Sequence, residues 1–139
     1  MTPDPKQEGQ RWLAAARNDL QGARLLRQGQ LHNLACFHCQ QAAEKALKAI
    51  LYAHGAQRVV GHGVQDLVKS VGKVDPAAAT IAPEAANLDR YYIPTRYPNG
   101  LPGGTPSEAY DSVDSEHAES VAEQVLQLAE QAIRRLPSG

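Results

Sequence analysis

One loop of this sequence combines side chains that are well suited to binding a nucleotide. Tyr92, Arg96 and Tyr97 stand among prolines that recur at positions 94, 98, 102 and 106. Because proline fixes φ and removes a backbone donor, residues 93–106 are expected to leave the helical pattern and form a stiffened surface loop. A planar guanidinium suits phosphates, and aromatic rings stack on bases. The loop is therefore a candidate site for a nucleotide or a nucleic acid.

Two lysines in an alanine-rich segment could supply further positive charge. Lys45 and Lys48 are three residues apart, so in a helix they lie on one stripe. One interpretation is a solvated helix face with an ordinary Glu44 to Lys48 pair, which contributes a few tenths of a kcal/mol. The functional interpretation is that both lysines form one wall of a cleft for an anionic ligand, with Arg96 facing them. In that arrangement the three cations hold a phosphate, and a tyrosine of the loop covers a base.

His62 stands alone between two glycines, at the expected start of a helix. It is either a capping or packing residue, or an imidazole placed beside the bound phosphate. The second role has a physical basis, because the unperturbed pKa of histidine, about 6.5, lets a modest local field set its charge. The sequence leaves both interpretations open, and His62 stays a candidate nucleotide-binding residue.

The two cysteines, Cys36 and Cys39, have the spacing of a redox or metal-binding pair. A zinc site needs two further ligands, and the histidines of the chain show no ligand spacing. We therefore interpret both thiols as small apolar groups on the buried side of a helix. The sequence predicts no metal site and no cofactor.

Composition limits the classes of function. The 139 residues include 14 basic and 15 acidic side chains, with a net charge of −1, so no global basic field favours nonspecific nucleic-acid binding. Any contact with a nucleic acid is expected to be local. The N-terminal residues lack an apolar signal core, and no run approaches the roughly 18 apolar residues of a membrane span. A cytoplasmic protein with no membrane partner is expected.

Apolar spacing predicts an all-α protein. Apolar residues recur at helical intervals over about 6–28, about 31–54, a shorter segment from Val64, and about 106–136. The second segment has the widest apolar arc and is predicted to be the central helix. No β-branched run with period two indicates a strand. Short connections favour an up-and-down bundle of four to five helices, in a single domain spanning residues 1–139.

Capping signals predict two helix starts near prolines. Asp75 and Pro76 are typical of a helix start, and this segment should run toward Leu88, with Pro83 either kinking or dividing it. Thr105–Glu108 has the pattern of a capping box with proline at the first helical position. The last long helix is therefore expected to begin there.

Two stretches of the sequence resemble one family. Residues 35–49, ACFHCQQAAEKALKA, resemble the second-helix signature of HEPN domains, small helical bundles named for nucleotide binding in higher eukaryotes and prokaryotes. Residues 88–99, LDRYYIPTRYPN, are similar to the family's tyrosine and arginine loop, and His62 with Leu67 resembles the start of its next helix. The resemblance covers nearly the whole chain. It implies a four- or five-helix bundle that pairs as a homodimer, often encoded beside a minimal nucleotidyltransferase in a toxin–antitoxin-like pair.

The resemblance also raises the question of RNA cleavage. Some family members are metal-independent RNases, in which an arginine and a histidine separated by four to six residues meet across the dimer. Arg27 and His32 have this spacing but lie at the turn between the first two helices, not where the family places its pair. Arg90 and Arg96 lie in the matching region without a histidine within reach. No catalytic residue is therefore assigned.

The leading hypothesis is a non-enzymatic, homodimeric HEPN protein that binds a nucleotide or nucleic acid and acts as partner of a nucleotidyltransferase. One alternative is a metal-independent HEPN RNase toxin, in which Arg27 and His32, or Arg96 and His62, cleave RNA. A further alternative is a structural partner whose loop docks another protein and binds no nucleotide.

Overall fold

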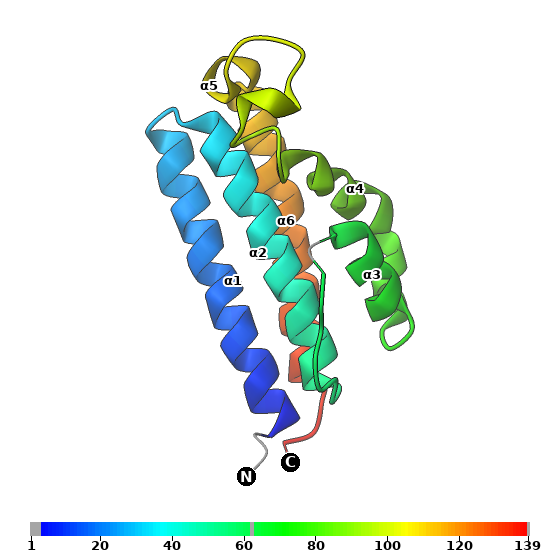
Figure 1. The fold of residues 1–139 in the computed structure, drawn as a ribbon. Helices are drawn as coiled ribbons and strands as arrows, with labels where there is room; N and C mark the ends of the chain where they lie inside the picture. The colour runs from blue at the N-terminus through cyan, green and yellow to red at the C-terminus, as the bar shows by residue number, and fades with distance from the viewer. Residues whose placement is uncertain (1–3, 62, 139) are drawn as a thin grey trace.

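Three long helices form the body of the protein; the shorter α3 and α4 pack on one side of it, and α5 lies at one end (Figure 1). The computed structural model describes residues 4–61 and 63–138. The predicted all-α bundle is confirmed, and no strand occurs in these two ranges. The elements are α1 (Pro5–Gln28), α2 (His32–Ala53), α3 (Val64–Gly72), η1 (Pro76–Thr80), α4 (Ala82–Ala86), η2 (Asn87–Tyr91), η3 (Pro98–Gly100), α5 (Pro106–Ala109) and α6 (Ser112–Arg134), where η marks a 3₁₀ helix.

The helix α2 is enclosed on several sides, as its wide apolar arc predicts. It packs against α1, α6, α3 and η2. Alanines dominate its buried surface, and small side chains let neighbouring helices approach closely. Larger apolar residues from the surrounding helices fill the remaining space. They include Leu13 and Leu20 of α1, Val64, Val68 and Val71 of α3, Leu88 of η2, and Val121, Val125 and Ile133 of α6.

Pro83 divides the segment that follows α3. The 3₁₀ helix η1 ends at Thr80, and α4 restarts at Ala82 with Pro83 in its first turn. Proline is tolerated there because the first backbone N–H groups of a helix lack intrahelical partners. The predicted start at Pro76 is confirmed, since the Asp75 side chain accepts a hydrogen bond from the backbone N–H of Ala77 at 3.1 Å.

The prediction of one continuous last helix from Pro106 is wrong. Tyr110 and Asp111 have extended backbone angles that separate the one-turn α5 from the long α6. The capping box belongs to α6, where Asp111 and Asp114 exchange side-chain to backbone hydrogen bonds of 3.1 and 2.9 Å. The Thr105 hydroxyl instead donates to the Glu108 carboxylate at 2.7 Å. The break occurs where the stronger carboxylate cap is available.

The described helices include none with the length and apolar character needed to cross a bilayer.

Gly9 marks the closest approach of α1 to α2. A Cβ atom at Gly9 would lie 2.6 Å from the Ala53 Cβ and 2.7 Å from the Ala49 carbonyl oxygen. Both distances are shorter than van der Waals contact, and the second involves backbone that has no rotamer to change. A side chain at this position therefore requires the two helices to separate.

Replacing Gly9 by alanine should lower the free energy of unfolding by about 1–3 kcal/mol, the usual cost of overpacking a close interface. Gly22→Ala is the matched control in the same helix, because nothing lies within 4 Å of its added Cβ. That variant should gain about 0.5–1 kcal/mol, since alanine is the better helix former. Urea denaturation of both variants gives the comparison. Equal effects of the two substitutions would contradict the close approach.

Candidate functional site

Arg96 lies among three aromatic rings. Its Cζ atom is 4.2 Å from the ring centroid of Phe37, 4.8 Å from that of Tyr92 and 5.1 Å from that of Tyr97. Its Nε donates a hydrogen bond to the Tyr92 carbonyl oxygen at 2.8 Å. We call these four residues the arginine-aromatic cluster. Cation–π attraction holds the guanidinium in place and leaves its terminal Nη nitrogens as donors.

Phe37 was not among the residues predicted for the site. It belongs to the first part of α2, and its ring lies 6.3 Å from that of Tyr92. One signal in the sequence could have indicated it, because Phe37, Gln41 and Lys48 share a stripe at helical spacings of four and seven. An aromatic ring on the polar stripe of a helix indicates a surface role or a contact with a loop.

Two buried hydrogen bonds anchor the loop that carries Arg96. Asn33, in the first turn of α2, donates from Nδ2 to the Thr95 carbonyl oxygen at 2.9 Å. The Thr95 hydroxyl, which is fully buried, donates to the Tyr91 carbonyl oxygen. The backbone N–H groups of Arg96 and Tyr97 both donate to Ile93, at 3.0 and 3.2 Å. The cluster is therefore built on a turn tied to the start of α2.

Asp89 links the cluster segment to α3. Its carboxylate accepts hydrogen bonds from the backbone N–H groups of Val64 at 2.7 Å and Gln65 at 3.0 Å, where α3 begins. The buried Gln40 side chain of α2 also approaches it, with a donor to acceptor distance of 3.5 Å. A carboxylate at a helix N-terminus is stabilised by the exposed N–H groups and the helix dipole. His62, the predicted site residue before this helix, lies outside the described residues.

Both predicted lysines are paired with carboxylates. Lys45 Nζ lies 2.6 Å from Asp19 Oδ2 of α1. Lys48 Nζ lies 3.0 Å from Glu44 Oε1 and 5.8 Å from the Trp12 ring centroid, with only 6% of the lysine exposed. The Glu44 to Lys48 pair expected for a solvated face therefore exists but is buried.

The lysines and Arg96 occupy different stretches of α2. Arg96 contacts Phe37, and Lys45 and Lys48 follow Phe37 by eight and eleven residues. At 1.5 Å per residue these separations correspond to about 12 and 16 Å of helix rise. The shared cleft of three cations stays a prediction, whereas the pairing of each lysine with an acid and of Arg96 with aromatic rings is a property of the structure.

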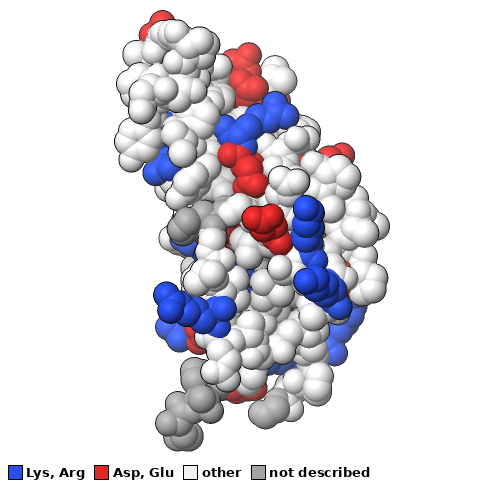
Figure 2. Space-filling model, turned by 45° about the vertical axis from the view of Figure 1, so that its right-hand side comes forward, with Lys and Arg blue, Asp and Glu red and all other residues white. Residues whose placement is uncertain are grey.

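The positive charge of Arg96 has no carboxylate within ion-pair distance in residues 4–61 and 63–138. Three arginines of α1 differ, since Arg17, Arg24 and Arg27 all pair with glutamates of α6. Figure 2 shows one face of the molecule, where lysine and arginine side chains are interspersed with acidic and uncharged ones instead of forming a continuous basic surface. Arg96 is therefore a local cationic group in a nearly neutral protein.

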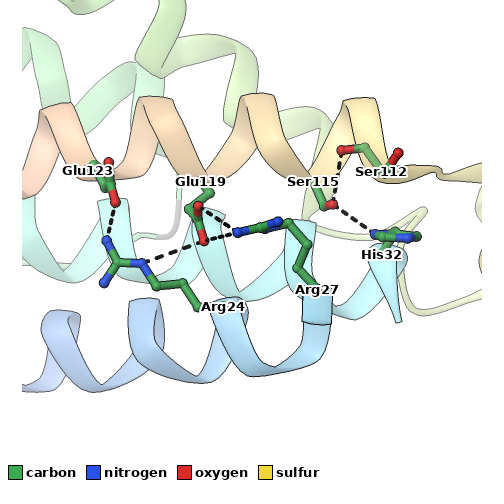
Figure 3. Close-up of polar contacts among 7 residues, drawn as sticks. All are labelled: Arg24, Arg27, His32, Ser112, Ser115, Glu119 and Glu123. Atoms are coloured by element: carbon green, nitrogen blue, oxygen red, sulfur yellow. Dashed lines mark hydrogen bonds and ion pairs between the residues drawn. The ribbon is translucent and has the colours of Figure 1, made fainter. Parts of the chain in front are cut away.

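Arg27 and His32, which have the spacing of an RNase pair, lie in the contact between α1, α2 and α6 (Figure 3). Arg27 Nη2 is 3.3 Å from a Glu119 oxygen. His32 Nδ1 is 2.8 Å from the hydroxyl of the buried Ser115, one turn before Glu119 on α6. Arg24 extends the same row and contacts both Glu119 and Glu123. The charge of Arg27 is thus already compensated, which weakens it as a stabiliser of a developing negative charge.

Cys36 and Cys39 are both fully buried, which confirms the interpretation of the thiols as small apolar groups. Burial, with a smaller contribution from Asp114, raises the pKa of the Cys36 thiol to about 12. Burial also raises the pKa of Cys39. Across the part of the chain that the structure describes, no group of three histidine, cysteine, aspartate or glutamate side chains is close enough to hold a metal ion.

Comparison with known proteins gives consistent matches. The family model described as the HEPN domain matches residues 10–135. A Methanocaldococcus jannaschii protein named "Putative toxin MJ1304" is 29% identical over 125 residues, which cover 84% of this chain and 82% of that protein. The crystal structure of TT1696 from Thermus thermophilus is 34% identical with a TM-score of 0.85, covering 90% of this chain and 98% of that one. An HEPN domain protein from Thermotoga maritima, tm0613, is 28% identical with a TM-score of 0.73, covering 91% and 99%.

Removing the Asn33 side chain should loosen the loop that carries Arg96. In Asn33→Ala the Thr95 carbonyl loses its buried donor, at a cost of about 1 kcal/mol or more. Trypsin should then cut faster after Arg96, and mass spectrometry can follow that cleavage. Asn18→Ala, at an exposed position of α1, is the control and should leave the rate unchanged. Equal cleavage rates in the two variants would show that Asn33 does not anchor the loop.

Both thiols should be unreactive in the folded protein. With a pKa of about 12, the Cys36 thiol is almost entirely protonated at pH 8, and a buried thiol is also shielded from the reagent. Labelling with a disulfide reagent at pH 8 should be slow in buffer. Once denaturant unfolds the chain, two thiols per protein molecule should react. Raising the pH toward 12 increases the thiolate fraction of Cys36. Because the thiol is also buried, labelling should accelerate only when the fold opens. Rapid labelling of the native protein at pH 8 would contradict this.

Proposed function

This chain belongs to the HEPN domain family, and from that premise we propose that it is a non-enzymatic HEPN protein that binds a nucleotide or nucleic acid at the arginine-aromatic cluster. The proposal includes a cytoplasmic homodimer that acts as partner of a nucleotidyltransferase in a toxin–antitoxin-like pair. The toxin in the name of the Methanocaldococcus jannaschii relative supports the toxin–antitoxin setting.

The observation that carries this proposal is the uncompensated charge of Arg96. A half-buried guanidinium in a folded protein usually pairs with a carboxylate, because desolvation of a charge is costly. Arg96 is held by rings and by one carbonyl oxygen, so its terminal nitrogens remain available to an anion. A phosphate oxygen pair matches the fork of those nitrogens.

The rings beside Arg96 complete the proposed site. Tyr97 is 51% exposed, and Tyr92 is partly exposed, so either ring can cover a base while the guanidinium binds the phosphate. The anchors at Asn33 and Thr95 hold this geometry before the ligand arrives, which lowers the entropic cost of binding.

Lys45 and Lys48 have a secondary role in this proposal. Each is neutralised by an acid in the unliganded protein, so a direct contact with phosphate requires an ion pair to break. His62 stays a proposed ligand contact on the sequence argument alone. The proposal thus assigns the main phosphate contact to Arg96.

A second candidate function is RNA cleavage, favoured by the toxin in the relative's name and by the contacts of Arg27 and His32 with Glu119 and Ser115, which lie one turn apart on α6. Cleavage of a structured RNA in the presence of a chelator, lost in His32→Ala, would support it. The proposed binding function would not predict that loss, so the two functions are distinguishable.

Truncating Arg96 should weaken ligand binding. Titration of ATP, GTP and a short RNA into wild-type protein and Arg96→Ala, followed by calorimetry, should show at least a tenfold loss of affinity, as expected for a charge-assisted bidentate contact. Arg11→Ala is the control, since Arg11 is an exposed arginine paired with Glu8 on α1. Equal binding by wild type and Arg96→Ala would place the ligand elsewhere. No binding by the wild type at millimolar ligand would refute the proposed function.

A further inference from the structure

A hollow of about 380 Å³ lies between α1 and α6, at the end of the molecule where α1 begins and α6 ends (Figure 1). On α1 its lining residues are spaced by four, three and four positions from Lys6 to Arg17, so they share one helix face. The buried side chains of Leu13 and Ile133 form an apolar floor. No residue of the arginine-aromatic cluster lines this hollow, so a ligand bound here would occupy a separate site.

Two contacts hold the helices together at the two ends of the hollow. At one end Arg17 Nη2 lies 3.0 Å from Glu130 Oε1. At the other end Lys6 Nζ donates a hydrogen bond to the Leu136 carbonyl oxygen at 2.6 Å. Lys6 and Arg17 are eleven residues apart, which corresponds to about 16 Å of helix rise. The hollow is therefore formed in the absence of a ligand, by contacts that do not fill it.

The charges around the hollow do not balance. Three lining side chains are cationic, Lys6, Arg17 and Arg134, and one is acidic, Glu130. Three cations less one acid leave an excess of two positive charges. Arg17 is paired with the acid, whereas Lys6 is bonded to a carbonyl oxygen that carries no net charge. Arg134 is exposed and has no carboxylate within ion-pair distance in residues 4–61 and 63–138.

The polar lining also offers more donors than acceptors. Ammonium and guanidinium groups only donate, and the guanidinium of Arg134 presents a planar fork of N–H groups. Gln10, exposed on α1, can add a donor from its amide nitrogen. The one carboxylate, that of Glu130, is already bonded to Arg17. Such a lining suits an oxyanion whose several oxygens accept hydrogen bonds at once.

Basic side chains at the end of a helix can also have a simpler role, because they complement the negative end of the helix dipole. Arg134 is the last residue of α6, and Arg135 is its C-cap. The dipole would stabilise both arginines, but only Arg134 lines the hollow. The two neighbours therefore form a matched pair that separates a binding role from the effect of the dipole.

We propose that this hollow binds a small oxyanion with two or more negative charges, such as phosphate or a polycarboxylate. Arg134 provides the unpaired guanidinium, and Lys6 and Arg17 provide positive charge at the two ends. This inference goes beyond the proposed function and does not rest on it, because the hollow and the arginine-aromatic cluster share no residue.

The test is calorimetry with the full-length wild type and with Arg96→Ala, which removes the cation of the other site. The ligands are citrate, inorganic phosphate and acetate, titrated near neutral pH at constant ionic strength. Citrate should bind at least tenfold more tightly than acetate, because several carboxylates can engage several donors. Both proteins should give the same affinity for citrate. Tighter binding of phosphate than of citrate would identify a phosphate site and the reverse order a polycarboxylate site, and either order supports the proposal.

Three variants locate the contacts. Arg134→Gln should weaken the binding of the preferred anion at least fivefold, because it removes the unpaired cation. Arg135→Gln makes the same change of charge one residue later and should bind as the wild type does. Glu130→Gln should tighten binding at least twofold, since it removes the acid and leaves Arg17 free for the ligand. A gain of affinity is a result that partial unfolding would not give, and circular dichroism confirms that each variant is folded.

Three results would overturn the inference. Equal losses of affinity in Arg134→Gln and Arg135→Gln would mean that the anion senses only the general charge of this end of the molecule. Loss of binding in Arg96→Ala would place the anion in the arginine-aromatic cluster and leave the proposed function standing. No binding of citrate or phosphate by the wild type at about 20 mM would show that the hollow holds no such ligand.

Discussion

The enclosure of α2 is the constraint on which the rest of the structure depends. Neighbours on several sides bury its alanines, and they also bury polar residues of the same helix, among them Gln40, Glu44 and Lys48. A buried charge is tolerated only with a partner of opposite sign or with hydrogen bonds. Lys48 and Glu44 are therefore joined to each other, and Lys45 reaches across to Asp19 on α1. Packing decides which cations of the helix can meet a ligand.

Arg96 is not paired with an acid within the described residues because of its position in the fold. It comes from the loop that covers the first turns of α2, where the neighbour is Phe37 and not an acid. Rings stabilise a guanidinium without cancelling its charge, since the attraction is to the ring quadrupole. Because the net charge of the chain is −1, the Arg96 guanidinium is a local positive charge and not part of a broad positive potential. Such a local charge selects ligands by the geometry of the contact more than by long-range attraction.

The fold could be predicted from the sequence because apolar spacing reports directly on helix faces. The same reasoning identified Arg96, Tyr92 and Tyr97, because their residue types and the neighbouring prolines are local signals in the sequence.

The sequence did not predict the ion pairs of the lysines. A helical wheel shows which way the Lys45 side chain points, but it does not show that Asp19 of another helix lies beside it. Phe37 was missed for the same reason, since its role depends on a loop about sixty residues later in the chain. The break at Tyr110 and Asp111 required a comparison of two competing caps, and only three-dimensional packing decides between them.

The cap that Asp89 places on α3 also limits where this chain can change in length. Asp89 is held at the start of α3 and Arg96 is held on Phe37, so the residues between them act as a tether with both ends fixed. An insertion or deletion inside the tether would move the guanidinium off its ring even if every helix stayed intact. Insertions should be better tolerated in the exposed stretch of glycine and proline at 101–105, before α5.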